Sequence, residues 1–96
     1  MAAEPEVPND EAQQVAAATT LLGLHGIPAG AREFRLRQEF FRHGWDVRVR
    51  EEGGAWSVRA VKPGRPDVGS EGTTEGNALR RALAEAIGYD EVREPF

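Results

Sequence analysis

The chain contains no cysteine among its 96 residues. Disulfide bonds, thiol nucleophiles and cysteine-ligated metals are therefore excluded. No apolar run approaches the ~18 residues that a membrane-spanning helix needs. The opening residues, MAAEPEVPNDE, lack the charged-then-apolar order of a signal peptide. We therefore expect a cytoplasmic protein that does not bind a membrane.

Residue patterns that carry catalysis are also missing. Neither His25 nor His43 has a carboxylate or second histidine at metal-ligand spacing, and neither Ser57 nor Ser70 lies in a nucleophile-elbow pattern. The glycines of residues 63–72 do not have the spacing of a phosphate-binding loop. The sequence therefore predicts no enzymatic activity, no catalytic or metal-binding residue and no cofactor.

Lysine is nearly absent, because Lys62 is the only one among twelve basic residues and the rest are arginines. Acidic residues number sixteen, so the formal net charge is −4. An acidic balance argues against non-specific nucleic-acid binding. Arginine nevertheless suits bidentate contacts to a carboxylate or a phosphate, so a local basic patch remains open as a binding surface.

The clearest pattern that is present is a β-hairpin. Residues 45–50 and 56–60 each alternate between apolar and polar side chains, and Gly53-Gly54 between them tolerates the positive φ angles of a tight turn. This turn would pair Val49 with Val58. The apolar residues then share one face of the sheet and the arginines share the other.

Helical spacing flanks this hairpin on both sides. Apolar residues recur at helical intervals over about residues 10–25, which Gly26 and Pro28 end, and over residues 73–88, where Thr73 or Thr74 can cap the first turn. Residues 62–72 are rich in glycine and proline and are interpreted as a loop. We expect a disordered tail over residues 1–8, a single domain over 9–88 and a C-terminal tail over 89–96.

Residues 32–42 are ambiguous between strand and helix. Residue propensities favour a helix, but on a helical wheel Phe34 and Phe41 point away from Leu36 and Phe40. A strand followed by a turn at His43-Gly44 would pair Phe40 with Val47 and Glu39 with Arg48. It would also keep the hairpin's apolar residues on one face. We therefore prefer the strand, with the helix as the alternative.

The preferred fold is α+β, a single domain in which a three-stranded antiparallel meander carries two helices on one face. The order of elements is α-β-β-β-α, and the helical alternative gives ααββα. An antiparallel sheet needs cover on one face only, and the two amphipathic helices supply it. The expected core is Val15, Leu22, Leu36, Phe40, Val47, Val49, Trp56, Val58, Leu79, Leu83 and Ile87.

In this fold, five arginines project from the open sheet face, with Glu39 and Asp46 among them. They form the candidate binding face: Arg35, Arg37, Arg48, Arg50 and Arg59. Charged residues on a solvent-exposed sheet are common, and surface ion pairs contribute only ~0–1 kcal/mol each. A docking surface for an acidic protein, or for a nucleic-acid backbone, is the functional interpretation of the same residues.

About half of the chain resembles HicB-type antitoxin domains. The matching residues are Val47-Arg48-Val49, the turn Glu51-Glu52-Gly53-Gly54, Trp56-Ser57-Val58, and Gly72-Thr73-Thr74-Glu75 leading to Ala78. The resemblance implies a partly degraded RNase H-like module that binds a protein partner and has no catalysis. The family's C-terminal DNA-binding segment has no counterpart here.

The αβββα order is also similar to that of double-stranded RNA-binding domains, which carry a lysine cluster at the start of their second helix. Residues 73–77 contain no lysine, so RNA binding in that manner is not expected. The sequence as a whole predicts a small non-enzymatic protein-interaction module with an antitoxin-like or regulatory role. Nucleic-acid binding through the arginine face is the alternative, and the oligomeric state is open.

Overall fold

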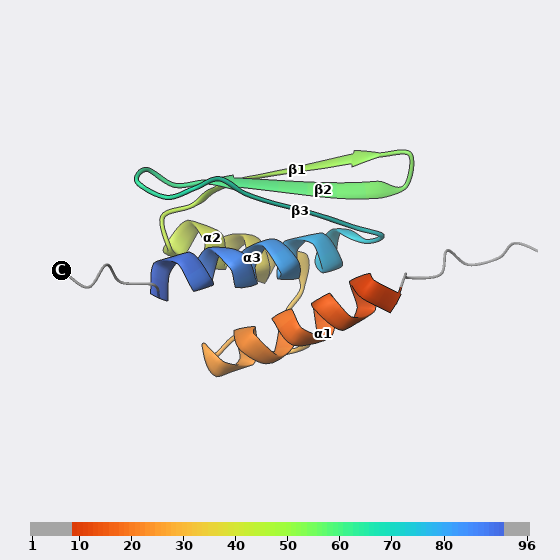
Figure 1. Cartoon of the computed structure of the whole chain (residues 1–96), viewed down its shortest axis with the longest axis horizontal. Coiled ribbons are helices and arrows are strands. Elements are labelled where there is room, and N and C mark those ends of the chain that lie inside the picture. The colour runs from red at the N-terminus through yellow and green to blue at the C-terminus, as the bar shows by residue number, and fades with distance from the viewer. Residues whose placement is uncertain (1–8, 92–96) are drawn as a thin grey trace, which may run out of the picture.

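The computed structural model describes residues 9–91. Its elements follow in the order α1 (Asn9–Leu24), α2 (Glu33–Arg42), β1 (Asp46–Glu52), β2 (Ala55–Val61), β3 (Val68–Gly72) and α3 (Glu75–Glu91). The strands form one antiparallel sheet in the order β1-β2-β3. Figure 1 shows α2 and α3 beneath this sheet and α1 beyond them. The α+β class and the antiparallel meander with helices on one face are confirmed; the predicted tail over 1–8 lies outside the described residues.

The β1–β2 hairpin has the predicted register. Val49 pairs with Val58, and Val47 pairs with Ala60. Gly53 and Gly54 form the turn with φ angles of 61° and 84°, which side chains with a Cβ rarely adopt. The alternating pattern therefore sorts the side chains by face as expected.

The preferred strand over residues 32–42 is wrong, because this segment forms α2. Leu36 and Phe40 lie one helical turn apart and are fully buried, whereas Phe34 and Phe41 lie on the opposite side and are exposed. A helix with apolar residues on both sides has no single apolar stripe, which is why its pattern resembled a strand. The predicted Phe40–Val47 strand pair is therefore absent.

The buried Glu39 carboxylate makes helical contacts and does not pair with Arg48. It accepts hydrogen bonds from Arg35 Nε at 2.9 Å and from Arg42 Nη1 at 3.3 Å, which are i,i+4 and i,i+3 neighbours. His43 caps the C-terminus of α2, and Gly44 follows with a φ of 82°. The His43-Gly44 pair therefore ends a helix instead of turning a hairpin.

The third strand lies in the segment that was interpreted as a loop. Val68 is fully buried and pairs with Ala60 on β2, while Gly72 pairs with Trp56. The ααββα alternative therefore has the correct helix at α2 but lacks β3. Helix α3 continues through Glu91, so the predicted C-terminal tail does not begin at residue 89.

The core lies between the inner face of the sheet and the helices. Most of the expected core residues are buried there; Val47, Val49 and Trp56 are partly buried and pack against it, and Val15 is half-buried. Nine further buried residues are absent from the expected core: Ala18, Ile27, Ala31, Trp45, Ala60, Val68, Ala78, Ala82 and Ala86. The fully buried Ala78, Ala82 and Ala86 give α3 a small-residue surface that allows close packing.

Helix α1 is fastened to the start of α3 by polar contacts. Glu11 is buried, and its Oε2 accepts hydrogen bonds from Thr73 N at 3.0 Å, Thr73 Oγ1 at 2.9 Å and Asn77 Nδ2 at 2.8 Å. Burial raises the pKa of Glu11, but these donors and the charge of Arg81 outweigh burial and hold the pKa below its ordinary value. Arg81 also donates a hydrogen bond to Gln14 on α1.

Gly72→Ala should destabilise the fold by about 1–3 kcal/mol, the usual cost of overpacking. A Cβ at this buried position would lie 2.8 Å from Ala78 N and 3.2 Å from Thr74 O, both backbone atoms at the start of α3. We expect a lower urea midpoint by circular dichroism. Gly69→Ala on the same strand is the control, because its Cβ would be 3.8 Å from the nearest atom; equal losses from both variants would contradict the steric argument.

Candidate functional site

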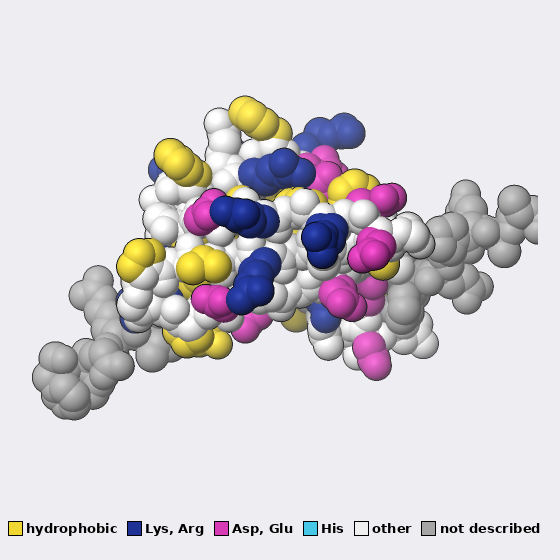
Figure 2. All heavy atoms as spheres, turned by 90° about the horizontal axis from the view of Figure 1, so that it is seen from above, with side chains coloured by type: hydrophobic (Ala, Val, Ile, Leu, Met, Phe, Trp, Pro, Cys, Tyr) yellow, Lys and Arg dark blue, Asp and Glu magenta, His cyan; other side chains and the backbone are white. Residues whose placement is uncertain are grey.

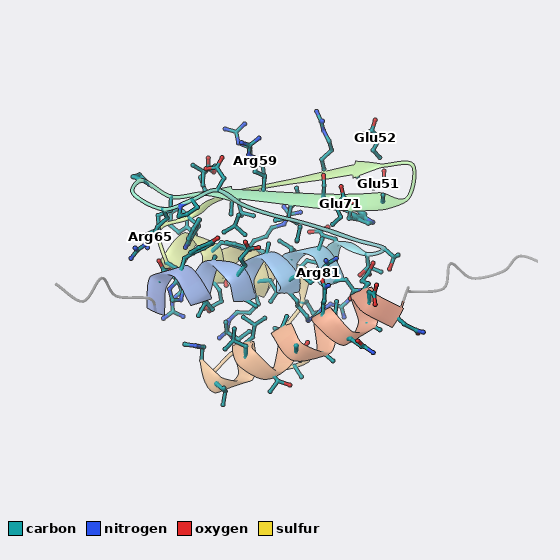
Figure 3. All side chains as sticks on the ribbon, viewed as in Figure 1. Glu51, Glu52, Arg59, Arg65, Glu71 and Arg81 are labelled. Carbon is teal, nitrogen blue, oxygen red and sulfur yellow. The ribbon has the colours of Figure 1, made fainter. Side chains whose placement is uncertain are left out.

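The open face of the sheet carries the densest group of exposed cations on the strands. Arg48 and Arg50 on β1 and Arg59 on β2 alternate with residues that face the helices. Figure 2 looks down on this face and shows basic side chains gathered over the sheet with acidic ones around them. Figure 3 shows Arg59 and Glu52 rising from the sheet on the side away from the helices. Arg48, Arg50 and Arg59 are called the arginine patch below.

Two members of the arginine patch stand directly opposite each other. Arg48 is the cross-strand partner of Arg59, and Arg50 is the partner of Ser57. Gly69 lies opposite Arg59 on β3 and has no side chain, so the patch borders a shallow depression. Like charges on opposed positions of a sheet destabilise it slightly. The arrangement therefore favours an anion placed between the two guanidinium groups.

Acidic residues offset part of this charge. Arg59 Nη2 lies 2.8 Å from Asp67 Oδ2, and Arg48 Nε lies 3.8 Å from Asp46 Oδ2. Both pairs are largely exposed to solvent, where such contacts contribute little to stability. Within residues 9–91, Arg50 has no ion pair. The patch can therefore exchange its internal partners for external ones at low cost.

Arg35 and Arg37 do not belong to this surface, which corrects the five-residue face expected from the sequence. Both lie on α2, on the other side of the sheet. Arg35 bonds Glu39, and Arg37 bonds Glu75 of α3 through Nη2 at 2.5 Å and Nε at 3.0 Å. Arg35 therefore pairs within α2, and Arg37 joins α2 to α3.

Sequence reasoning missed three residues of this site, namely Asp67, Gly69 and Glu71, because β3 was interpreted as a loop. All three border the depression beside the arginine patch. A single large apolar residue, Val68, marks the strand in the sequence. One valine between prolines and glycines gives no period that could have indicated a strand.

A second polar cluster joins the end of α3 to the sheet. Asp90 accepts hydrogen bonds from Trp45 Nε1 at 3.1 Å and from Lys62 Nζ at 2.9 Å, and Lys62 Nζ lies 5.8 Å from the centre of the Trp45 ring. Burial raises the pKa of Asp90, but the two donors and the charges of Lys62 and His43 outweigh it and lower the pKa. Every member of this cluster has a protein partner, so we assign it a structural role.

Metal binding has no cluster of ligands to support it in the part of the chain that the structure describes. No group of three or more His, Asp or Glu residues between residues 9 and 91 could hold a metal ion. His43 caps α2, with its Nδ1 3.6 Å from Asp90 Oδ2. Among the described helices, none is long and apolar enough to cross a membrane.

Comparison with known proteins gives no relative. The chain matches no family model, no curated protein and no solved structure.

Proposed function

We propose that the chain is a non-enzymatic protein-interaction module that binds an acidic segment of a partner through the arginine patch. The direct opposition of Arg48 and Arg59 across β1 and β2 supports this proposal. A carboxylate between the two guanidinium groups would replace their repulsion with charge-assisted hydrogen bonds. Arg50 would supply a third contact.

A protein fits this patch better than a nucleic acid does. Asp46, Asp67 and Glu71 lie around the arginines and would repel a continuous phosphate backbone. The formal net charge of −4 adds to that repulsion. A protein segment of mixed charge can instead place its own basic residues against these carboxylates. Nucleic acid is the second candidate, because phosphates would contact the same three guanidinium groups.

The resemblance to HicB-type antitoxin domains predicts what kind of role such a module would have. An antitoxin-like protein would use the patch to bind and inhibit a toxin, and a regulatory protein would use it to bind another partner. Both remain predictions. Either role requires a surface that binds without catalysis, which agrees with the proposal.

The double variant Arg50→Glu/Arg59→Glu should lose binding to an acidic peptide by about tenfold or more, since like charges then meet at the interface. The measurement is fluorescence anisotropy with a labelled glutamate-rich peptide, in a salt series. Arg32→Glu is the matched control, because Arg32 is an exposed arginine that precedes α2. Equal loss in the control, or no binding by the unchanged protein even at low salt, would refute the proposal.

A second arm of the same experiment separates the two candidate partners. A mixed pool of DNA and RNA oligonucleotides replaces the peptide. Tighter binding to the pool than to the peptide, with a steep loss as salt increases, would identify nucleic acid as the ligand of the patch. The protein proposal expects weak binding to the pool.

A further inference from the structure

Helix α2 exposes two phenylalanines that the fold does not use. Phe34 is 73% exposed and Phe41 is 83% exposed, although Leu36 and Phe40 on the other side of the same helix are fully buried. Removing such a ring from water is favourable, so two exposed rings favour a partner that covers them. A pair of exposed rings seven residues apart on one helix is therefore typical of a surface that a partner covers.

Strand β1 continues this surface. It lies at an edge of the sheet and pairs with β2 over all seven of its residues, without a proline or a bulge. A groove lined by Arg37, Phe41, Asp46 and Val47 joins the exposed side of α2 to the first half of β1. Regular edge strands readily pair with another chain unless something protects them. The other edge strand, β3, is shorter and packs against α3.

We infer that a second copy of this chain covers the surface, through antiparallel pairing of β1 with β1 of the partner and contact between the two α2 helices. Paired residues of antiparallel strands share a face, so a two-fold axis within the seven-residue strand must pass between one β1 residue and the same residue of the other copy. In each of these registers, β1 (DVRVREE) lies antiparallel to the same strand of the partner, so the register determines which residues stand opposite each other.

Only the register centred on Val47 avoids opposing two like charges. It places Asp46 of each copy opposite Arg48 of the other, and it brings Trp45 close to Val49 of the other copy. A centre at Val49 would oppose Arg48 to Arg50. A centre at any charged residue would oppose that residue to itself. Charge complementarity therefore selects the Val47 register and supports a second copy of the chain as the partner.

The same axis brings the exposed phenylalanines together. Val47 lines the groove that also contains Phe41 and Arg37, so an axis at Val47 passes beside the middle of α2. The two antiparallel helices would then place Phe34 of one copy near Phe41 of the other. Arg37 lies between these rings in the sequence of α2. Its charge is already paired with Glu75 of the same copy, so contact between the two helices would not oppose two unpaired arginines. The two sheets would join into one continuous sheet.

Sedimentation equilibrium tests this inference on the full chain, and we expect a dimer. Asp46→Arg alone and Arg48→Asp alone each set like charges opposite each other twice, and each should raise the dimer dissociation constant about tenfold or more. The combined variant Asp46→Arg/Arg48→Asp restores both pairs and should restore the dimer. This rescue distinguishes the Val47 register from other ways of pairing.

Two further variants complete the test. Phe41→Glu should also weaken the dimer, and Arg59→Asp should not, because Arg59 lies on the central strand β2. Circular dichroism checks that each variant is folded. A monomeric unchanged protein at about 100 µM, or failure of the combined variant to restore the dimer, would overturn the inference. Arg48 belongs to both surfaces, but the peptide-binding variant Arg50→Glu/Arg59→Glu leaves the Asp46–Arg48 pairs of the dimer intact, so either proposal can fail without the other.

Discussion

Val58→Asp should unfold the domain. Val58 is 2% exposed and lies on the central strand, between Val49 on β1 and Ser70 on β3. The sheet on one side and the helices on the other leave an introduced carboxylate without water or a basic partner. An unpaired buried charge costs several kcal/mol, which is comparable with the ~5–15 kcal/mol that stabilises a typical domain. Far-ultraviolet circular dichroism should show loss of structure at 25 °C.

The matched control for this variant is Val61→Asp. Val61 lies on the same strand but on the open face, where it is 42% exposed. There the new carboxylate lies on the surface opposite Asp46, so the same change should lower the free energy of unfolding by only about 1 kcal/mol or less. Similar destabilisation of both variants would mean that the two faces of β2 are wrongly assigned.

Glu11→Gln should destabilise the domain by about 2 kcal/mol or more at neutral pH. The Glu11 carboxylate accepts three hydrogen bonds at the N-terminus of α3, and bonds to a charged acceptor contribute ~1.5–3 kcal/mol each. The negative charge also interacts favourably with the helix dipole. Chemical denaturation at pH 7 measures the loss. Asp10→Asn, an exposed neighbour on α1, is the control and should have little effect.

The loss caused by Glu11→Gln should depend on pH with a defined sign. The pKa of Glu11 is lowered in the folded protein, so the unfolded chain takes up a proton first as the pH falls. The stabilisation by Glu11 is therefore complete above its ordinary pKa of 4.5 and disappears as the pH falls through the lowered value. The difference in stability between the two proteins should shrink over this range. A difference that stayed constant to pH 2 would contradict the assignment.

Local sequence signals were sufficient for the hairpin and for α3. Gly53-Gly54 and the alternation around it determine the register of β1 with β2, because a one-residue slip would bury Arg48 and expose Val49. The apolar spacing of α3 survives in the structure, and Thr74 Oγ1 caps it by accepting a hydrogen bond from Asn77 N. In both cases, residues that are close together in the sequence determine the structure.

Helix α2 could not be predicted in this way, because its apolar residues serve two different surfaces. Leu36 and Phe40 pack into the core, whereas Phe34 and Phe41 remain outside. Prediction from apolar periodicity assumes that all large apolar residues of a helix face the core. The feature that made the helix hard to recognise is therefore the one that marks its exposed side as a contact surface.

The candidate site was predicted only as far as the hairpin extends. Arg48, Arg50 and Arg59 share the open face because their strands and register were correct. Arg35 and Arg37 were assigned to that face through the wrong strand. The acidic residues of β3 were missed because a strand of five residues with two glycines has too little pattern of its own and forms by pairing with β2.

The contacts of Lys62 determine how this protein responds to reagents that modify amines. Lys62 provides the only side-chain amine in the chain; it pairs with Asp90 and lies over the Trp45 ring, and 28% of its side chain is exposed. Acylating labels and lysine-directed cross-linkers therefore have one side-chain target, which is partly buried, and they do not modify the arginine patch. Coupling chemistry aimed at carboxylates or guanidinium groups would modify the surfaces proposed to bind partners. The choice of attachment chemistry thus decides whether an immobilised sample keeps its binding surfaces accessible.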